Sequence, residues 1–245
     1  MQSTTSGTLT AETSQLIARL AADRTTLRRL PAPWQRTALW LMSVLPCVAT
    51  VTAVHLAGRD VVERVDVRMA VEQAAILLTG LTAALAAFST VVPGRDWRIS
   101  LLPLVPLGVW LGSLGEGCMH DWSRLGADGL QVRSDWDCVP SAIVLSIPSA
   151  AIMLVMLRRG APVFPSLTLA LGALASAAMV NFGLRLFHAG DAAVMVLVWH
   201  FGGIAAVTIL AGRFGGYVFN CRCKGASRAV SRQSTSAAAG ISRDL

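Results

Sequence analysis

Residues 69–92 read MAVEQAAILLTGLTAALAAFSTVV, and this stretch decides the fold class. Its only charged side chain is Glu72, and a helix crosses the hydrocarbon core of a bilayer in about 20 such apolar residues. Five further stretches qualify on the same grounds: residues 37–57, 99–115, 139–157, 163–184 and 192–212. The sequence therefore predicts an all-α, polytopic membrane protein with a bundle of six transmembrane helices.

The composition of the whole chain agrees with this interpretation. Of its 245 residues, 54% are hydrophobic and only 14% are charged, and the mean hydropathy is +0.58. An ordinary soluble domain carries about a quarter of its residues as Asp, Glu, Lys and Arg. A chain with so few charges cannot cover a globular surface, which excludes a large soluble helical domain.

Basic residues are divided unequally between the two sides of the predicted bundle. Fifteen Lys and Arg fall before the first span, in the second and fourth connections, and after the sixth span, whereas six fall on the opposite side. Because positive residues stay inside, we expect both termini to be cytoplasmic. The net charge of +7 thus follows from topology, and no basic patch interleaved with aromatic residues indicates nucleic-acid binding.

The segment before the first span, residues 1–36, contains a leucine pattern. Leu16, Leu20 and Leu27 recur at helical spacing, and the pattern predicts an amphipathic helix over about residues 10–30. Two interpretations stay open. The helix lies on the inner leaflet with its Arg residues toward anionic lipid, or its leucine stripe binds a cytoplasmic protein.

The remaining organisation follows from where the apolar runs stop. Residues 37–212 form the predicted six-helix transmembrane domain. Residues 213–245 are basic, and they are rich in Ser, Ala and Gly from 225 onward. This composition predicts a cytoplasmic tail near lipid that is disordered beyond about residue 225.

The longest predicted outer connection, residues 116–137, carries five acids and two Arg and is flanked by cysteines. In an oxidising compartment a disulfide between Cys118 and Cys138 is the default state, and it would tie two helix ends together. The same thiols can also switch between dithiol and disulfide under oxidants. When reduced, they can bind a thiophilic metal with His120 and a carboxylate, from Asp121 or Asp137. Staple, redox sensor and metal sensor use the same atoms, and a transient metal ion here is the only cofactor left open.

A second polar cluster lies around the fifth and sixth spans. Arg185, His188 and Asp191 follow one another at intervals of about one helical turn, and His200 lies deep in the sixth span. Glu72 of the second span is a candidate partner for Arg185. Ionisable groups at such depth usually face the interior of the bundle. The cluster is a hydrogen-bonded clamp between helices, a ligand or proton sensor, or the path of a small-solute or ion permease.

Motifs of soluble enzymes are missing from the sequence. It contains no P-loop, no G-x-G-x-x-G, no H-E-x-x-H and no G-x-S-x-G, so we expect no enzyme. Small residues one turn apart, as in Gly80-x-x-x-Ala84 and Gly172-x-x-x-Ser176, predict that helices pack closely.

Several segments, taken in order, resemble a known family. They are LIARLAAD (16–23), RRLPAPW (28–34), VPGR (92–95), SLGEGC (113–118), SDWDC (134–138) and LRLFH (184–188), followed by Asp191 and Trp199-His200. Over about residues 10–220 the chain resembles the NrsF family of bacterial inner-membrane anti-sigma factors, which are six-helix proteins.

The resemblance implies a function as well as a location in the bacterial inner membrane. It implies that the N-terminal segment sequesters an extracytoplasmic-function sigma factor, and we assign the contacts to Leu16, Ile17, Leu20, Asp23 and Leu27. It further implies that Cys118 and Cys138 are the family's paired outer cysteines, needed to respond to stress. The alternative function is a permease that uses Arg185, His188, Asp191 and His200.

Overall fold

The computed structural model describes residues 13–15, 17–18, 30–57, 67–92, 94–126, 138–160, 162, 164–187 and 196–218. It divides the chain after Pro31 into a short N-terminal unit and a second unit, Ala32–Leu245, that contains the long helices. In the N-terminal unit, residues 13–15 and 17–18 are helical and exposed. Four of the predicted sigma-factor contacts lie outside the described residues: Leu16, Leu20, Asp23 and Leu27. The helix over residues 10–30 therefore stays a prediction.

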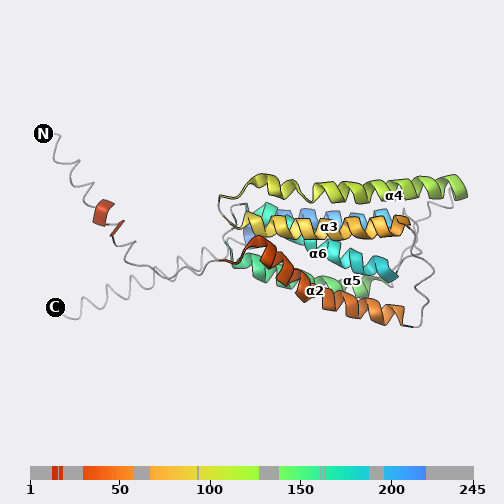
Figure 1. Cartoon of the computed structure of the whole chain (residues 1–245), viewed down its shortest axis with the longest axis horizontal. Helices are drawn as coiled ribbons and strands as arrows, with labels where there is room; N and C mark the ends of the chain where they lie inside the picture. Colours follow the sequence, from red (N-terminus) through yellow and green to blue (C-terminus); the bar gives the residue numbers. More distant parts are fainter. Residues whose placement is uncertain are drawn as a thin grey trace. The chain divides into compact units, whose positions relative to one another are not determined.

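The second unit is built from helices that run side by side (Figure 1). The long ones are α2 (Pro33–Leu56), α3 (Val67–Thr90), α4 (Leu104–Leu125), α5 (Cys138–Arg158) and α6 (Pro165–Phe187). A 3-10 helix, η2 (Trp97–Leu101), precedes α4, and a π-helix, η4 (Val196–Phe201), leads into the helix Gly202–Val218. The described residues contain no strand, which confirms the all-helical class.

Among the described residues, five helical segments are long and apolar enough to cross a membrane. They are Pro33–Leu56, Val67–Thr90, Trp97–Leu125, Pro140–Arg158 and Pro165–Leu186. The predicted count of six is not confirmed, because the α-helical part of the sixth apolar run is the shorter helix Gly202–Val218. The residues just before it are wound as the π-helix η4.

Helices α3 and α6 form the centre of the bundle. Their mutual contact is the most extensive between any two elements, and 61% of the apolar stretch of each is buried, against 17% for the segment that contains α4. Small side chains permit this approach. A Cβ added to Gly80 of α3 would lie 3.4 Å from the Cβ of Ala178 in α6, and Ala83 and Ala84 are fully buried. Gly80, one of the small residues that predicted close packing, lies at this contact, whereas Gly172 faces Met153 and Leu157 of α5.

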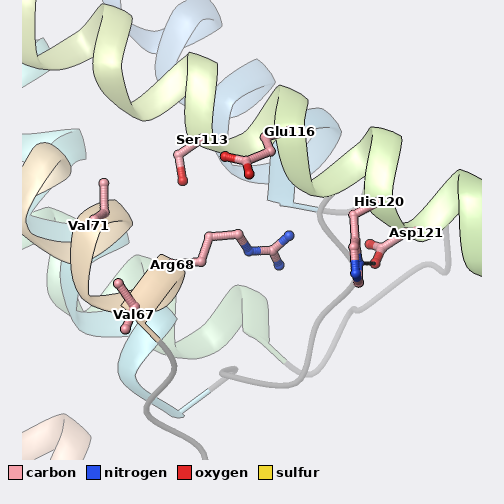
Figure 2. Close-up of a pocket in the computed structure, with 7 residues that line it drawn as sticks. All are labelled: Val67, Arg68, Val71, Ser113, Glu116, His120 and Asp121. Atoms are coloured by element: carbon pink, nitrogen blue, oxygen red, sulfur yellow. Dashed lines mark ion pairs between the residues drawn. The ribbon is translucent and has the colours of Figure 1, made fainter.

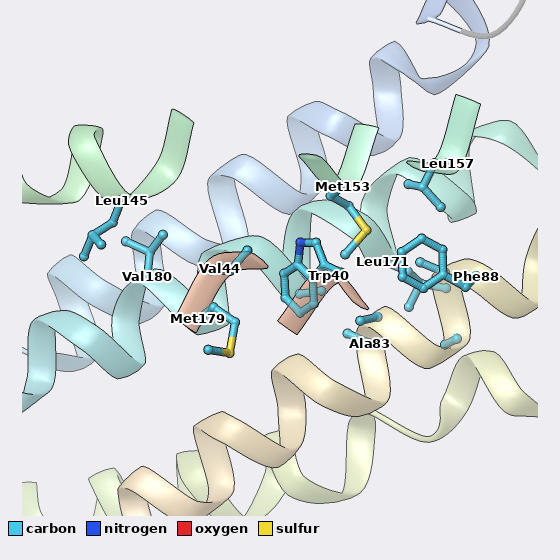
Figure 3. Close-up of a cluster of buried hydrophobic side chains, with 14 of the residues drawn as sticks. Trp40, Val44, Ala83, Phe88, Leu145, Met153, Leu157, Leu171, Met179 and Val180 are labelled. Carbon is cyan, nitrogen blue, oxygen red and sulfur yellow. The ribbon is translucent and has the colours of Figure 1, made fainter. Parts of the chain in front are cut away.

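Helices α2 and α5 are held to this centre by large side chains (Figure 3). Trp40 of α2 is fully buried in one cluster with Phe88 of α3, Met153 of α5 and Met179 of α6. Its indole Nε1 donates a hydrogen bond to the backbone carbonyl of Ser149, at 3.4 Å. The buried Trp40 thus joins an apolar cluster that four helices share, including its own, while its indole N–H has a hydrogen-bond partner.

Helix α4 departs from the sequence prediction in its position along the chain. The sequence predicts a span at 99–115 followed by a loop at 116–137. The first part of that loop is helical instead, because α4 continues through residues 116–125. Pro103 is the N-cap of α4 and Pro106 lies in its first turn, where no helical N–H bond is lost. No proline follows before Gly126, whose φ of 62° ends the helix.

Two helices extend beyond residues 37–212, the predicted transmembrane domain, whose limits stay a prediction. Helix α2 begins at Pro33, because proline is favourable in the first turn of a helix. At the other end the last helix continues to Val218, six residues into the predicted tail. The polar residues there did not interrupt the helix, since the end of an apolar run marks the end of a hydrophobic surface and not the end of backbone hydrogen bonding.

Gly215 permits a close contact between the helix Gly202–Val218 and the start of α6. A Cβ at Gly215 would lie 2.5 Å from the Cα of Ser166 and 2.7 Å from the carbonyl oxygen of Pro165. Both are backbone atoms that cannot rotate away, so Gly215→Ala is expected to push the helices apart and lower the unfolding temperature in detergent. Gly216→Ala is the control, because nothing lies within 4 Å of that position and alanine favours a helix by about 1 kcal/mol. Equal unfolding temperatures for the two variants would contradict this packing.

Candidate functional site

A polar cavity of about 520 Å³ lies between the first turns of α3 and the last turns of α4 (Figure 2). Its lining residues are Val67, Arg68 and Val71 from α3 and Ser113, Glu116, His120 and Asp121 from α4. In the close-up the guanidinium of Arg68 extends from α3 toward the side chains of α4. The cavity therefore has a cation on one wall and two carboxylates with an imidazole on the other.

The wall of the cavity that α4 contributes exists because this segment is helical. Ser113, Glu116 and His120 are separated by three and four residues, so their side chains lie on one face of the helix. His120 Nδ1 lies 3.8 Å from Asp121 Oδ1, and these two residues are partly or fully exposed. Had residues 116–121 formed the loop that the sequence predicted, no such shared face would exist.

Next to the cavity, three charged side chains form a triad, of which Glu72 and Arg185 are buried. Glu72 of α3 is 1% exposed, and its Oε2 accepts hydrogen bonds from Nη2 of Arg185 at 3.2 Å and from Nε of Arg185 at 3.4 Å. Its Oε1 lies 3.4 Å from Nε of Arg68, one helical turn earlier. The structure thus contains the pair of Glu72 and Arg185 that was inferred from depth in the sequence, and it adds Arg68.

Arg68 links the triad to the cavity. Its side chain is 31% exposed and lines the cavity, whereas the side chains of Glu72 and Arg185 are almost completely buried. An unpaired charge in an apolar bundle is costly, and Glu72 is the carboxylate that the structure places in contact with both arginines. A change in the charge or position of Arg68 therefore alters the environment of Glu72, and with it the ion pair between Glu72 and Arg185 that joins α3 to α6.

A second polar pair lies on the same side of α6. His200 Nδ1 is 2.9 Å from Oδ1 of Asn181, and Asn181 precedes Arg185 by one helical turn. His200 belongs to the π-helix η4, and short π-helical segments are frequent at functional sites. His188 and Asp191 lie outside the described residues, so the structure brings together Glu72 and Arg185 in one group and His200 with Asn181 in another.

The two cysteines lie on helices. Cys118 is in α4, half-buried and with a free thiol, and Cys138 is the first residue of α5, with a side chain outside the described residues. The disulfide therefore stays a prediction. No group of three or more metal ligands occurs among the residues whose placement is described, and Asp137 is not one of them. A metal ion held by Cys118, His120, Asp121, Asp137 and Cys138 is thus an untested hypothesis.

Some polar contacts were missed by the sequence interpretation. Arg68 and Glu72 stand four residues apart, a spacing that favours ion pairs on a helix, and this signal was available. His55 Nε2 lies 3.0 Å from Oγ of Ser141 and joins α2 to α5. Nothing in the sequence pairs these two residues, because their contact depends on the rotation of both helices.

Long apolar helices that bury their charges in the interior are typical of polytopic membrane proteins. The family model of NrsF, described as negative regulator of sigma F, matches residues 20–220 of this chain. The chain therefore belongs to the NrsF family, a family of regulators named for a sigma factor. Neither the curated proteins nor the solved structures contain a significant match to the chain.

The triad predicts a large effect for a change at Glu72. Glu72→Met removes the carboxylate that contacts both arginines, and breaking a buried pair in this way costs about 3–5 kcal/mol. We expect a clear fall in the unfolding temperature in detergent. Glu116→Gln, on the exposed wall of the cavity, is the control and should change it little.

A double variant distinguishes a loss of stability caused by the broken ion pair from a loss caused by the changed side-chain shape. In Glu72→Met/Arg185→Met both buried charges of the shorter contact are gone, so much of the lost stability should return. A double variant that is no more stable than Glu72→Met would show that the loss did not come from the broken contact of Glu72 with Arg185.

Proposed function

We propose that the chain is a membrane-bound anti-sigma factor that holds an extracytoplasmic-function sigma factor at the bacterial inner membrane. The observation that carries this proposal is the family match over residues 20–220, whose description is a negative regulator of a sigma factor. A sigma factor held at the membrane cannot join RNA polymerase. No direct binding of nucleic acid by this chain is then needed, and no enzymatic step.

The proposed partner contact is the N-terminal segment. The chain divides after Pro31, so residues before it belong to a unit separate from the bundle. Ile17 is 61% exposed, as a contact residue for a partner has to be. The leucine stripe of Leu16, Leu20 and Leu27, with Asp23 beside it, would then bind the sigma factor as an amphipathic helix.

The proposed topology has six crossings with both termini in the cytoplasm. The excess of Lys and Arg on one side supports the orientation. The sixth crossing would combine η4 with the helix Gly202–Val218, a continuous helical run over residues 196–218. In this orientation the polar cavity, the triad and both cysteines lie at the outer ends of their helices.

We further propose that the stress signal acts on α4. This helix is the least buried of the long helices, and its main contact is with α3. A chemical change at Cys118 and Cys138, whether oxidation or metal binding, would move α4 relative to α3. The cavity wall of Glu116, which faces Arg68, would move with it, and the triad would carry the change toward α6.

The permease alternative has less support. In the described residues, Arg185 is bonded to Glu72 and His200 to Asn181, so polar groups that were candidates for a transport path are engaged with neighbouring helices. This arrangement favours the clamp.

The partner contact is tested by co-purification. Leu16→Asp/Leu20→Asp places two charges in the leucine stripe, and we expect the sigma factor to be lost from the purified protein because its apolar contact is gone. The control is Ala18→Asp/Thr25→Asp, which puts the same charges on the opposite face of the predicted helix. If the leucine variant retains the sigma factor as well as the parent does, the assignment of this helix is wrong.

The sensor is tested by transcription from a sigma-dependent promoter. Cys118→Ser is expected to hold the output in one state, with or without an oxidant or a thiophilic metal, because the proposed chemistry needs that thiol. Cys47→Ser is the control, since Cys47 is a half-buried free thiol within α2. A Cys118→Ser/Cys138→Ser variant that still responds normally would show that the cysteines have only a structural role.

A further inference from the structure

A second cavity, of about 330 Å³, lies at the opposite end of the bundle from the polar one. Its floor is the last turn of α3 with Ser89 and Thr90, and its walls come from η2 with Ile99 and from the start of α6 with Leu167. Arg95, in the turn between α3 and η2, also lines it. The cavity thus lies where three elements end, at a boundary between the bundle and its short connections.

The hydroxyl groups of this cavity are engaged within the protein. Oγ1 of Thr90 lies 2.8 Å from Oγ1 of Thr168, Oγ of Ser89 donates to the carbonyl of Leu85, and Oγ of Ser100 donates to the carbonyl of Trp97. They are therefore not directed at a ligand. The walls offer mainly apolar area, which suits an aliphatic chain better than a small polar molecule.

The surroundings of the cavity are strongly basic. The two connections at this end, residues 92–98 and 158–164, contain four arginines and one acid, Asp96. Asp96 also lines the cavity, and it caps η2, because its Oδ1 accepts a hydrogen bond from the backbone N–H of Arg98 at 2.9 Å. In the described part of the chain Arg95 has no ion pair, and it is exposed. The lining itself carries one arginine, Arg95, and one acid that is engaged in the cap, and the net positive charge of the two connections favours an anion at Arg95.

Large apolar side chains around the cavity are exposed rather than packed. Trp97 is 64% exposed, Phe164 58% and Leu167 39%. Tryptophan is enriched where a membrane meets water, with its ring among the headgroups. The apolar walls match the acyl chain of a phospholipid, and Arg95, which has no ion pair with another described residue, matches its phosphate.

We propose that this cavity binds one anionic phospholipid, with the phosphate at Arg95 and part of an acyl chain between Ile99 and Leu167. This site rests on the proposed membrane-spanning arrangement, and it is independent of sigma-factor binding. The lipid would connect the turn before α4 to the start of α6, two elements at this end of the bundle. An acidic surface of the sigma factor is the competing occupant, and the experiment separates the two.

The test is native mass spectrometry of the full chain, purified in mild detergent and titrated with phosphatidylglycerol or phosphatidylcholine. The parent should bind one phosphatidylglycerol in preference to phosphatidylcholine. One basic residue near an anionic lipid contributes about 1 kcal/mol, which is about fivefold in affinity, so Arg95→Gln should lose about that factor. Arg95→Lys should retain most of the binding, and Leu167→Trp should weaken it by filling the cavity with Arg95 intact.

Arg213→Gln is the matched control, because Arg213 is an exposed arginine of the last helix that does not line the cavity. Equal retention of both lipids, or equal binding by Arg95→Gln and Arg213→Gln, would overturn the proposal. So would an Arg95→Gln variant that loses its sigma factor while binding phosphatidylglycerol as the parent does. Recovery of the parent outside the membrane fraction would instead contradict the membrane-spanning arrangement.

Discussion

The rest of the bundle depends on the contact of Glu72 with Arg185 between α3 and α6. Two opposite charges buried in long, mainly apolar helices have to meet, because either one alone would face lipid or apolar side chains at a high cost. Their meeting sets the rotation of both central helices. Gly80 and the alanines of α3 then fit against α6, and the outer helices pack around this pair.

Arg68 connects this central ion pair to the polar cavity at one end of the bundle. It lies at 3.4 Å from the same carboxylate and also lines the polar cavity opposite Glu116. Helix α4 forms the other wall of that cavity and is packed less tightly than α3 or α6. A regulator of a sigma factor needs an element whose position can change, and in the proposed mechanism the weakly held α4 is that element.

The apolar spans could be predicted from the sequence because lipid-crossing helices need long runs of one kind of residue. The prediction of 69–92 for the second span, for example, compares with Val67–Thr90 in the structure. The course of α4 could not be predicted in the same way. Residues 116–121 are polar and were interpreted as a loop, whereas backbone hydrogen bonding continues there until Gly126. The polarity of a residue indicates whether its side chain faces water or lipid, and it does not indicate where the helix ends.

The sequence by itself determined that the chain is helical, that its helices are apolar enough for a membrane, and that its basic residues concentrate in the N-terminal segment, in two connections and in the C-terminal segment. These properties depend on composition along single segments, and the family follows from the same order of segments. Only the tertiary structure decided that Arg68 joins Glu72 and Arg185, that Glu116 and His120 face them, and that a second cavity lies beside Arg95. These contacts depend on how each helix is rotated toward its neighbours, and that rotation is set by packing between residues far apart in the chain.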